Sequence, residues 1–211
     1  EKQFENAKLV IEQAKKQGVD EEKLNVLEGQ LASISETDNI GSISPSPEQL
    51  SSLLGHFQNG RYDDAEQLAL SLSIQFPRHN LSWKILGAVL KKTGRESEAV
   101  FTGERTIENA PDDAEAHFNL GNTLRVINRL DDAESSYRQS IALKPDNAPP
   151  HNNLGITLQE LGRLDEAEAS VRQAIALKPD YAEARYNLGV VLNELGRLNE
   201  AEESYTQAIA L

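Results

Sequence analysis

Two consecutive stretches of 34 residues decide the fold of this chain. Residues 114–147 read AEAHFNLGNTLRVINRLDDAESSYRQSIALKPDN, and residues 148–181 read APPHNNLGITLQELGRLDEAEASVRQAIALKPDY. Each stretch contains a Leu-Gly pair, an alanine in its second half and a proline near its end. The same columns recur with this period along the chain: Gly87, Gly121, Gly155 and Gly189; Ala65, Ala99, Ala133, Ala167 and Ala201; Pro77, Pro111, Pro145 and Pro179; Leu90, Leu124, Leu158 and Leu192. Several columns that share one period indicate an internal repeat.

Each repeat reads as two helices joined by a short turn. In residues 114–147, Leu120 and Leu124 have helical spacing, and Asn128 interrupts the pattern. A second helix begins at Asp131, because a carboxylate suits the positive N-terminal end of a helix. It ends before Pro145, because proline cannot continue a helix. Other repeats place a glycine in the turn, where a left-handed backbone is favourable for glycine: Gly60, Gly94, Gly162 and Gly196.

These columns resemble the tetratricopeptide repeat family, whose signature over 34 residues is W-x2-L-G-x2-Y, then A-x3-F, then P. The second unit reads Trp83-x2-Leu86-Gly87-x2-Leu90, followed by Ala99 and Pro111. The fifth reads Arg185-x2-Leu188-Gly189-x2-Leu192, followed by Ala201-x3-Tyr205. The resemblance implies an all-α fold, an α-solenoid of stacked antiparallel helix pairs that forms a right-handed superhelix. It implies binding to other proteins, but it does not identify the partner.

The expected organisation has three parts. Residues 1–36 lie outside the repeat register and carry heptad-like apolar spacing, which predicts an N-terminal helical hairpin. Residues 37–47 are rich in Ser, Pro and Gly and read as a linker. The repeat array follows over residues 46–211, with repeats at 46–79, 80–113, 114–147, 148–181 and 182–211. The last repeat stops short of its register, so we expect the array to continue. We also expect Ala201, Tyr205 and Ala208, or neighbouring apolar atoms, to be exposed. The missing initiator methionine likewise indicates a fragment or a processed product.

Two units depart from the pattern. The first keeps only Gly60, Ala65 and Pro77 in register, which is typical of a degenerate or capping repeat. The second has Gly103 inside its second helix, where larger residues are usual and glycine costs about 1 kcal/mol relative to alanine. We interpret this position as a thinned interface between helices that Phe101 fills, with a ligand notch as the alternative.

Composition excludes several classes of protein. The formal net charge is −13, and phosphate binding needs clustered Lys and Arg, so we expect no binding to nucleic acid. The chain has no cysteine, which excludes disulfides and thiolate metal sites. No apolar run approaches the roughly 20 residues that span a bilayer, so we expect no membrane insertion. A cytoplasmic location is a separate expectation.

The sequence gives no sign of an enzyme, a metal site or a cofactor. Phosphate-binding glycine loops, zinc-protease motifs and nucleophile elbows are absent from it. His117 and His151 occupy the column in which Trp83 stands, one repeat apart, and we expect them to pack between helices rather than bind metal. No catalytic residue and no cofactor are therefore expected.

The candidate binding residues lie on the first helix of each repeat, which lines the concave groove in the family that the chain resembles. Three repeats carry an asparagine at the same position: Asn119, Asn153 and Asn187. The neighbouring positions on this face add Asn122, Asn152, Asn193, Arg125, Phe118, Tyr186, Lys84 and Lys91. The Asn row is similar to the asparagine ladder of O-linked N-acetylglucosamine transferase. Because an amide offers two donors and an acceptor, such a row can hold the backbone of an extended peptide. The structural alternative is that asparagine is simply common at this position.

Three functions remain open from the sequence. The first is a protein–protein interaction scaffold that binds an extended peptide or partner helix in its groove. The second is a substrate-recognition arm of a larger enzyme, such as a glycosyltransferase or sulfotransferase. The third is self-assembly into a homo-oligomer through the ends of the array or the N-terminal hairpin. If the Asn row binds a peptide, replacing it by alanine is expected to weaken binding and to leave folding almost unchanged.

Overall fold

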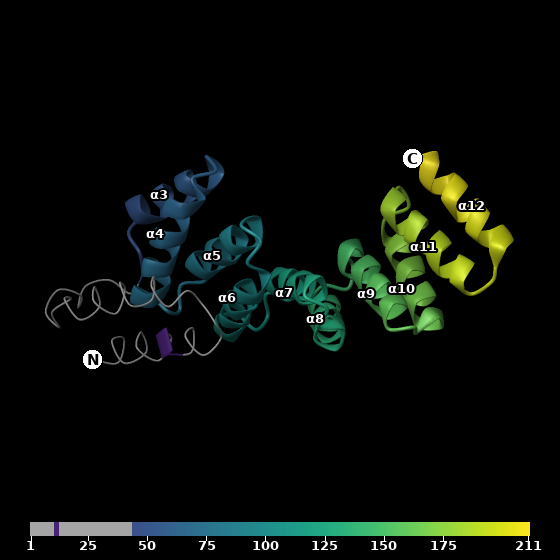
Figure 1. Ribbon diagram of the computed structural model, residues 1–211, viewed down its shortest axis with the longest axis horizontal. Helices are drawn as coiled ribbons and strands as arrows, with labels where there is room; N and C mark the ends of the chain where they lie inside the picture. Colours follow the sequence, from purple (N-terminus) through teal and green to yellow (C-terminus); the bar gives the residue numbers. More distant parts are fainter. Residues whose placement is uncertain (1–10, 13–43) are drawn as a thin grey trace, which may run out of the picture. The chain divides into compact units, whose positions relative to one another are not determined.

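The computed structural model describes residues 11, 12 and 44–211 (Figure 1). The chain divides into two compact units, one that ends at Pro111 and one that covers Asp112–Leu211. The 34-residue period runs through this boundary without a break. The N-terminal hairpin and most of the linker lie outside the described residues. Pro47, the last residue of that linker, is the first residue of a helix.

The described part of the first unit contains two helix pairs. Its helices are α3 (Pro47–Gln58), α4 (Tyr62–Gln75), α5 (Asn80–Lys92) and α6 (Glu96–Asn109). Ser46 caps α3, since its hydroxyl accepts a hydrogen bond from the Gln49 amide and its own amide donates to the Gln49 side chain. Each helix contacts the next one along the chain, and α3 also contacts α5.

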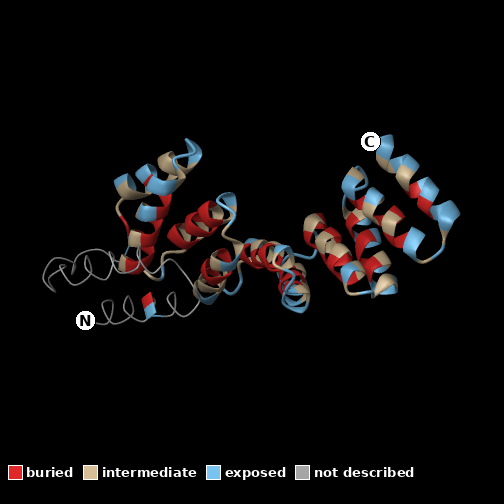
Figure 2. Cartoon of the chain, viewed as in Figure 1, coloured by how far each residue is buried: buried red, intermediate tan, exposed pale blue. Residues whose placement is uncertain are grey.

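The second unit contains three helix pairs. Its helices are α7 (Ala114–Val126), α8 (Leu130–Leu143), α9 (Ala148–Glu160), α10 (Leu164–Leu177), α11 (Ala182–Glu194) and α12 (Leu198–Ile209). Successive helices contact one another, and each first helix also contacts the first helix of the next repeat. Buried residues lie on the sides of the helices that face their neighbours (Figure 2). The described residues form helices and turns only, which confirms the all-α fold.

A left-handed residue joins the two helices of every repeat. The turn glycines predicted from the sequence have φ between 71° and 76°. Asn128 takes this place in the third repeat with φ 62°, a conformation that asparagine tolerates better than most residues. The chain therefore reverses direction at the same point in each repeat.

The glycine of the Leu-Gly pair lets the two helices of a repeat approach closely. A Cβ atom built on Gly155 would lie 2.3 Å from Cγ2 of Val171 and 3.2 Å from the backbone oxygen of Ala167. At Gly121 the same atom would lie 2.7 Å from the ring of Tyr137. The Leu-Gly column is thus a packing requirement of the helix pair, because any side chain there would clash with the second helix.

The second repeat buries a pair of aromatic rings between its two helices. Phe101 and Trp83 are both buried, and their rings meet edge to face with centroids 5.8 Å apart. The guanidinium of Arg105 lies 5.6 Å from the centroid of the Phe101 ring. The interpretation of Gly103 as a thinned interface stays a prediction.

Residues of the Trp column hydrogen-bond to the preceding proline carbonyl. Trp83 donates its Nε1–H to Pro77 O at 2.8 Å, and His151 places Nε2 3.0 Å from Pro145 O. Arg185 donates Nε and Nη2 to Pro179 O. His117 is buried in the same column. The column therefore ties each first helix to the loop before it, and its histidines have structural roles.

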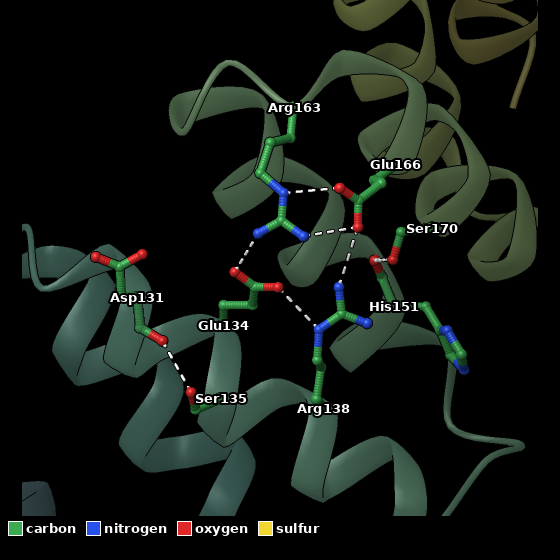
Figure 3. A network of polar contacts seen from close by, with 8 residues as sticks. All are labelled: Asp131, Glu134, Ser135, Arg138, His151, Arg163, Glu166 and Ser170. Carbon is green, nitrogen blue, oxygen red and sulfur yellow. Dashed lines mark hydrogen bonds and ion pairs between the residues drawn. The ribbon is translucent and has the colours of Figure 1, made fainter.

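An arginine at the start of the second helix links neighbouring repeats (Figure 3). Arg163 donates Nε and Nη2 to Glu166 on its own helix, and Nη1 to Glu134 of the previous repeat at 2.6 Å. Arg197 makes the same contacts with Glu200 and Glu168. In the first unit, Arg95 contacts Glu98 and the buried Glu66 in the same way. We call this set of ion pairs the arginine ladder.

The ladder is expected to make the second unit less stable in acid. The guanidinium of Arg163 lowers the pKa of Glu166, and that of Arg197 lowers the pKa of Glu200. Burial acts to raise the pKa of Glu134, but the hydrogen bonds from Arg138 and Arg163 together lower it. A glutamate whose pKa is lowered in the folded state stabilises the fold at pH values above its ordinary pKa of 4.5. This stabilisation is lost as the pH falls through the lowered pKa.

Thermal unfolding followed by circular dichroism between about pH 7 and about pH 3 measures this effect. We expect the melting temperature to decrease as the pH is lowered from 4.5 to about 3. The Glu134→Gln variant should show a smaller decrease over the same range. A melting temperature that stays constant down to pH 3 would show that these ion pairs contribute little.

The last helix corrects the expectation for Ala201, but it does expose neighbouring apolar side chains. Ala201 is only 3% exposed, because it packs into the cluster that contains Leu188 and Leu192. Tyr205 packs against this cluster too. The exposed apolar side chains of α12 are instead Leu198 and Ile209, at 62% and 87%.

Candidate peptide-binding face

The first helices of the second unit carry a chain of hydrogen-bonded amides. Asn122 Oδ1 accepts two hydrogen bonds, from Tyr137 OH at 2.8 Å and from Asn153 Nδ2 at 2.7 Å. Tyr137 belongs to the second helix of its repeat, so this contact ties α7 to α8 and to α9. Two amides at different positions of neighbouring repeats are therefore connected.

Asn152 continues the chain of amides into the next repeat. Its Nδ2 lies 3.3 Å from Asn153 Oδ1 and 3.4 Å from Glu183 Oε1, and its Oδ1 accepts from Asn187 Nδ2 at 3.0 Å. The Asn152 side chain is fully buried. Its amide is directed from α9 toward α11, where it contacts Glu183 and Asn187. It is therefore not available to a ligand.

The other members of the face differ in exposure. Asn119 is half-buried, and its side chain makes no hydrogen bond to any described residue; Asn193 is exposed. The ring of Phe118 lies against Tyr137 at 6.0 Å between centroids. Tyr186 is 56% exposed and lies 5.6 Å from Tyr205. The face thus combines polar amides with two accessible aromatic side chains.

Polar side chains at the ends of the first helices pair across repeats. Arg125 Nη1 donates to Glu160 Oε1 at 3.1 Å, and Gln159 Nε2 donates to Glu194 Oε1 at 2.5 Å. Arg125 Nε is buried without a hydrogen-bond partner in the described structure. Burial raises the pKa of Tyr137, so its hydroxyl stays protonated and donates to Asn122 at neutral pH.

The two lysines of the candidate set belong to the first unit. Lys84 and Lys91 lie on α5, and both are half-buried. Burial lowers the pKa of the Lys91 ammonium. The structure brings together the candidates of the second unit, and it gives no reason to place these lysines on the same face.

Sequence reasoning missed the residues that orient the amides. Tyr137 stands in the column that usually holds phenylalanine. Its additional hydroxyl could have indicated a hydrogen bond to a neighbouring amide, which is made to Asn122. The burial of Asn152 carried no such signal, because Lys84 and Tyr186 at the same repeat position are not buried. In the described part of the chain there is no group of acidic or histidine side chains that could hold a metal ion. No helix of that part is long and apolar enough to cross a bilayer.

The repeated helix pairs, the Leu-Gly contact and the left-handed turn define an α-helical repeat protein. The tetratricopeptide repeat model matches residues 54–113 and 152–211, so the chain belongs to the tetratricopeptide repeat family. Two further models of the same repeat match residues 121–162 and 102–135. The family consists of protein-interaction scaffolds that are generally non-catalytic, and this chain has the architecture of such a scaffold.

Solved structures confirm the fold. A structure of MamA from AMB-1 is 26% identical, with a TM-score of 0.68, and the match covers 76% of this chain and 95% of that one. MamA from Desulfovibrio magneticus RS-1 is 17% identical, with a TM-score of 0.72 and coverage of 79% and 97%. YrrB, described as a tetratricopeptide repeat protein with an unusual peptide-binding site, is 17% identical, with a TM-score of 0.69 and coverage of 79% and 86%. No curated protein sequence matches the chain.

Proposed function

We propose that the first-helix face of the second unit binds an extended peptide through the peptide backbone. The observation that carries this proposal is the chain of amides from Asn122 through Asn153 and Asn152 to Asn187. Hydrogen bonds among these side chains fix their rotamers, so less conformational entropy is lost when a ligand binds. A rigid row of amides recognises a backbone regardless of its sequence.

The asparagines of the Asn row, Asn119, Asn153 and Asn187, still have donors and acceptors that can bind a ligand. Asn153 uses one amide hydrogen on Asn122, and Asn187 uses one on Asn152, which leaves the second hydrogen of each. Asn187 also keeps its oxygen, since no described group donates to it. Asn119 keeps its whole amide. Phe118 and Tyr186 would supply apolar contacts to side chains of the peptide, and Asn193 and Arg125 flank the row.

The similarity to YrrB, which has a peptide-binding site, supports a peptide as the ligand. The formal net charge of −13 favours a protein partner over nucleic acid. A cytoplasmic location and self-association through the N-terminal hairpin stay predictions. Among the described residues no feature favours the enzyme-arm alternative.

The test replaces Asn119, Asn153 and Asn187 together by alanine. Each lost hydrogen bond is worth about 0.5–1.5 kcal/mol, so we expect peptide affinity to fall by about one to three orders of magnitude. A random peptide library displayed on phage would supply the ligand, and fluorescence anisotropy would give its Kd. Asn199→Ala is the matched control, because Asn199 is an exposed residue of α12 on the second-helix side.

The triple variant is expected to lose folding stability as well as affinity, so the two effects must be separated. Removing Asn187 leaves the buried Asn152 oxygen without its donor, which costs about 1–3 kcal/mol of stability. The expectation that folding would hardly change therefore applies to Asn119→Ala and not to the triple variant. If Asn119→Ala alone keeps the full melting temperature and loses at least threefold in affinity, the amides bind ligand. If every affinity loss parallels a loss of stability, the row is structural and the proposal is wrong.

A further inference from the structure

The chain of amides on the first-helix face has a direction. Asn187 donates to Asn152, and Asn152 donates to Asn153. Asn153 donates in turn to Asn122, whose oxygen also accepts from Tyr137. The donors of this chain therefore point along the row from α11 to α7. Because hydrogen bonds in a chain polarise one another, the unused oxygen of Asn187 becomes a stronger acceptor at the α11 end.

Helix α11 carries two carboxylates that have no cation as a partner. Glu183 Oε1 lies 3.4 Å from the amide of Asn152, and Glu194 accepts a hydrogen bond from Gln159. Both glutamates are exposed, and neither forms an ion pair in the described part of the chain. Arg185 is the basic residue of α11, but its guanidinium donates to the loop before this helix and to α12. It therefore does not neutralise the two glutamates.

The other basic side chains around α11 already have partners. Arg197 donates to carboxylates of α10 and α12. The ammonium of Lys178 lies 5.0 Å from the centroid of the Tyr181 ring. On the first-helix side, Arg125 of α7 pairs with Glu160. The negative charge of α11 is thus left to attract a cation from a ligand.

Two tyrosine rings lie beside these carboxylates. Tyr186 is 56% exposed, and the centroid of its ring is 5.6 Å from that of Tyr205 on α12. Tyr186 stands three residues after Glu183, so both lie on the same face of α11. Burial raises the pKa of Tyr205, and Tyr186 and Glu194 raise it further, so the charge of Glu194 acts at this ring. An exposed aromatic ring next to negative charge attracts a cation.

The hydroxyl of Tyr205 is also available to a ligand. In the third repeat, the equivalent Tyr137 donates to Asn122 and is fully buried. In the fifth repeat, Val190 stands at the position of Asn122, so Tyr205 has no amide oxygen to which it can donate. Its hydroxyl makes no hydrogen bond to a described residue, and it can accept one from a ligand.

We propose that the peptide on this face carries an arginine or a lysine, whose cation lies over the tyrosine pair, Tyr186 and Tyr205, and is attracted by the two carboxylates of α11. The inference rests on the proposed peptide-binding function and specifies its ligand. The amide row binds a backbone of any sequence, so it does not by itself select a partner. A basic side chain supplies this selection, because its methylene groups pack on the rings and its N–H groups suit the free oxygen of Asn187.

Selection of a random peptide library on the whole chain tests this inference. We expect arginine and lysine to be enriched about threefold over the unselected library. The variant with Glu183→Gln and Glu194→Gln, the double glutamine variant, should lose this enrichment. It should keep its fold, because glutamine retains an oxygen for Asn152 and for Gln159. Circular dichroism checks the fold.

A matched variant separates this site from the general acidity of the chain. Glu202→Gln with Glu203→Gln removes the same charge from exposed positions of α12. A difference between the two variants therefore reflects the place of the carboxylates and not their number. We expect the control variant to recover peptides with the same enrichment in basic residues as the parent.

Fluorescence anisotropy then measures the size of the effect. The most enriched peptide is synthesised with a dye, together with a copy in which norleucine or citrulline replaces the basic residue. The double glutamine variant should bind the first peptide about five- to tenfold more weakly than the parent does, and the second about equally well. Tyr186→Leu keeps an apolar surface and should weaken binding of the first peptide about threefold.

The outcomes separate this inference from the function on which it rests. If peptides bind in a manner that depends on Asn119 but show no excess of basic residues, the cation site is wrong and the peptide-binding function stands. Full affinity of the double glutamine variant, or an equal loss in the control variant, would also overturn the cation site. If the parent recovers no peptide, the proposed function fails and this inference fails with it.

Discussion

Replacing Trp83 by alanine is expected to lower the free energy of unfolding of the first unit by about 3–5 kcal/mol. The indole ring is 1% exposed, meets Phe101 edge to face and donates to Pro77 O at 2.8 Å. The substitution removes the ring contact and this hydrogen bond, and it leaves a cavity between α5 and α6. Urea unfolding followed by far-ultraviolet circular dichroism measures the loss.

Trp83→Phe is the control for this prediction. It keeps most of the buried ring and removes the hydrogen bond to Pro77, so we expect a loss nearer 1 kcal/mol. If both variants unfold at the same urea concentration as the parent, the aromatic pair does not hold the second repeat together.

The second large effect is expected at Gly155. Alanine is a better helix former than glycine by about 1 kcal/mol, yet Gly155→Ala should destabilise the second unit by about 1–3 kcal/mol. The new methyl group would meet Val171 Cγ2 at 2.3 Å and the Ala167 backbone oxygen at 3.2 Å. The side chain of Val171 can rotate, but the backbone of α10 cannot move without separating the helix pair.

Gly55→Ala is the matched control inside a helix. A Cβ atom on Gly55 meets nothing within 4 Å, so the same substitution should stabilise α3 by about 0.5–1 kcal/mol. The two variants should therefore shift the urea midpoint in opposite directions. A stabilised Gly155→Ala protein would contradict the close approach of α9 and α10.

The repeat columns predicted the fold because each has one physical role. The Leu-Gly pair sets the approach of two helices, the turn glycines reverse the chain, and the proline ends the second helix. These features depend on local geometry and on one neighbouring helix, both of which repeat with the sequence.

Other features of the site could not be predicted from a single position. Asn152 and Asn153 are adjacent on one helix, yet only Asn152 is fully buried, because Asn153, Glu183 and Asn187 converge on its amide. The burial of Ala201, by contrast, follows from its column, because Ala65, Ala99, Ala133 and Ala167 are buried too.

The arginine ladder lets the array change its length without redesign. Within the second unit, Arg163 and Arg197 pair with Glu134 and Glu168 of the repeat before them. Arg129 pairs with Asp132 of its own helix. A duplicated copy of such a repeat would therefore carry both the arginine and the glutamate. The ion pair between neighbouring repeats would form again at the new boundary. Val100 occupies the position of these glutamates in the second repeat, so a duplicated second repeat would lack the glutamate of the ion pair. In this protein, growth by duplication is favoured within residues 114–211.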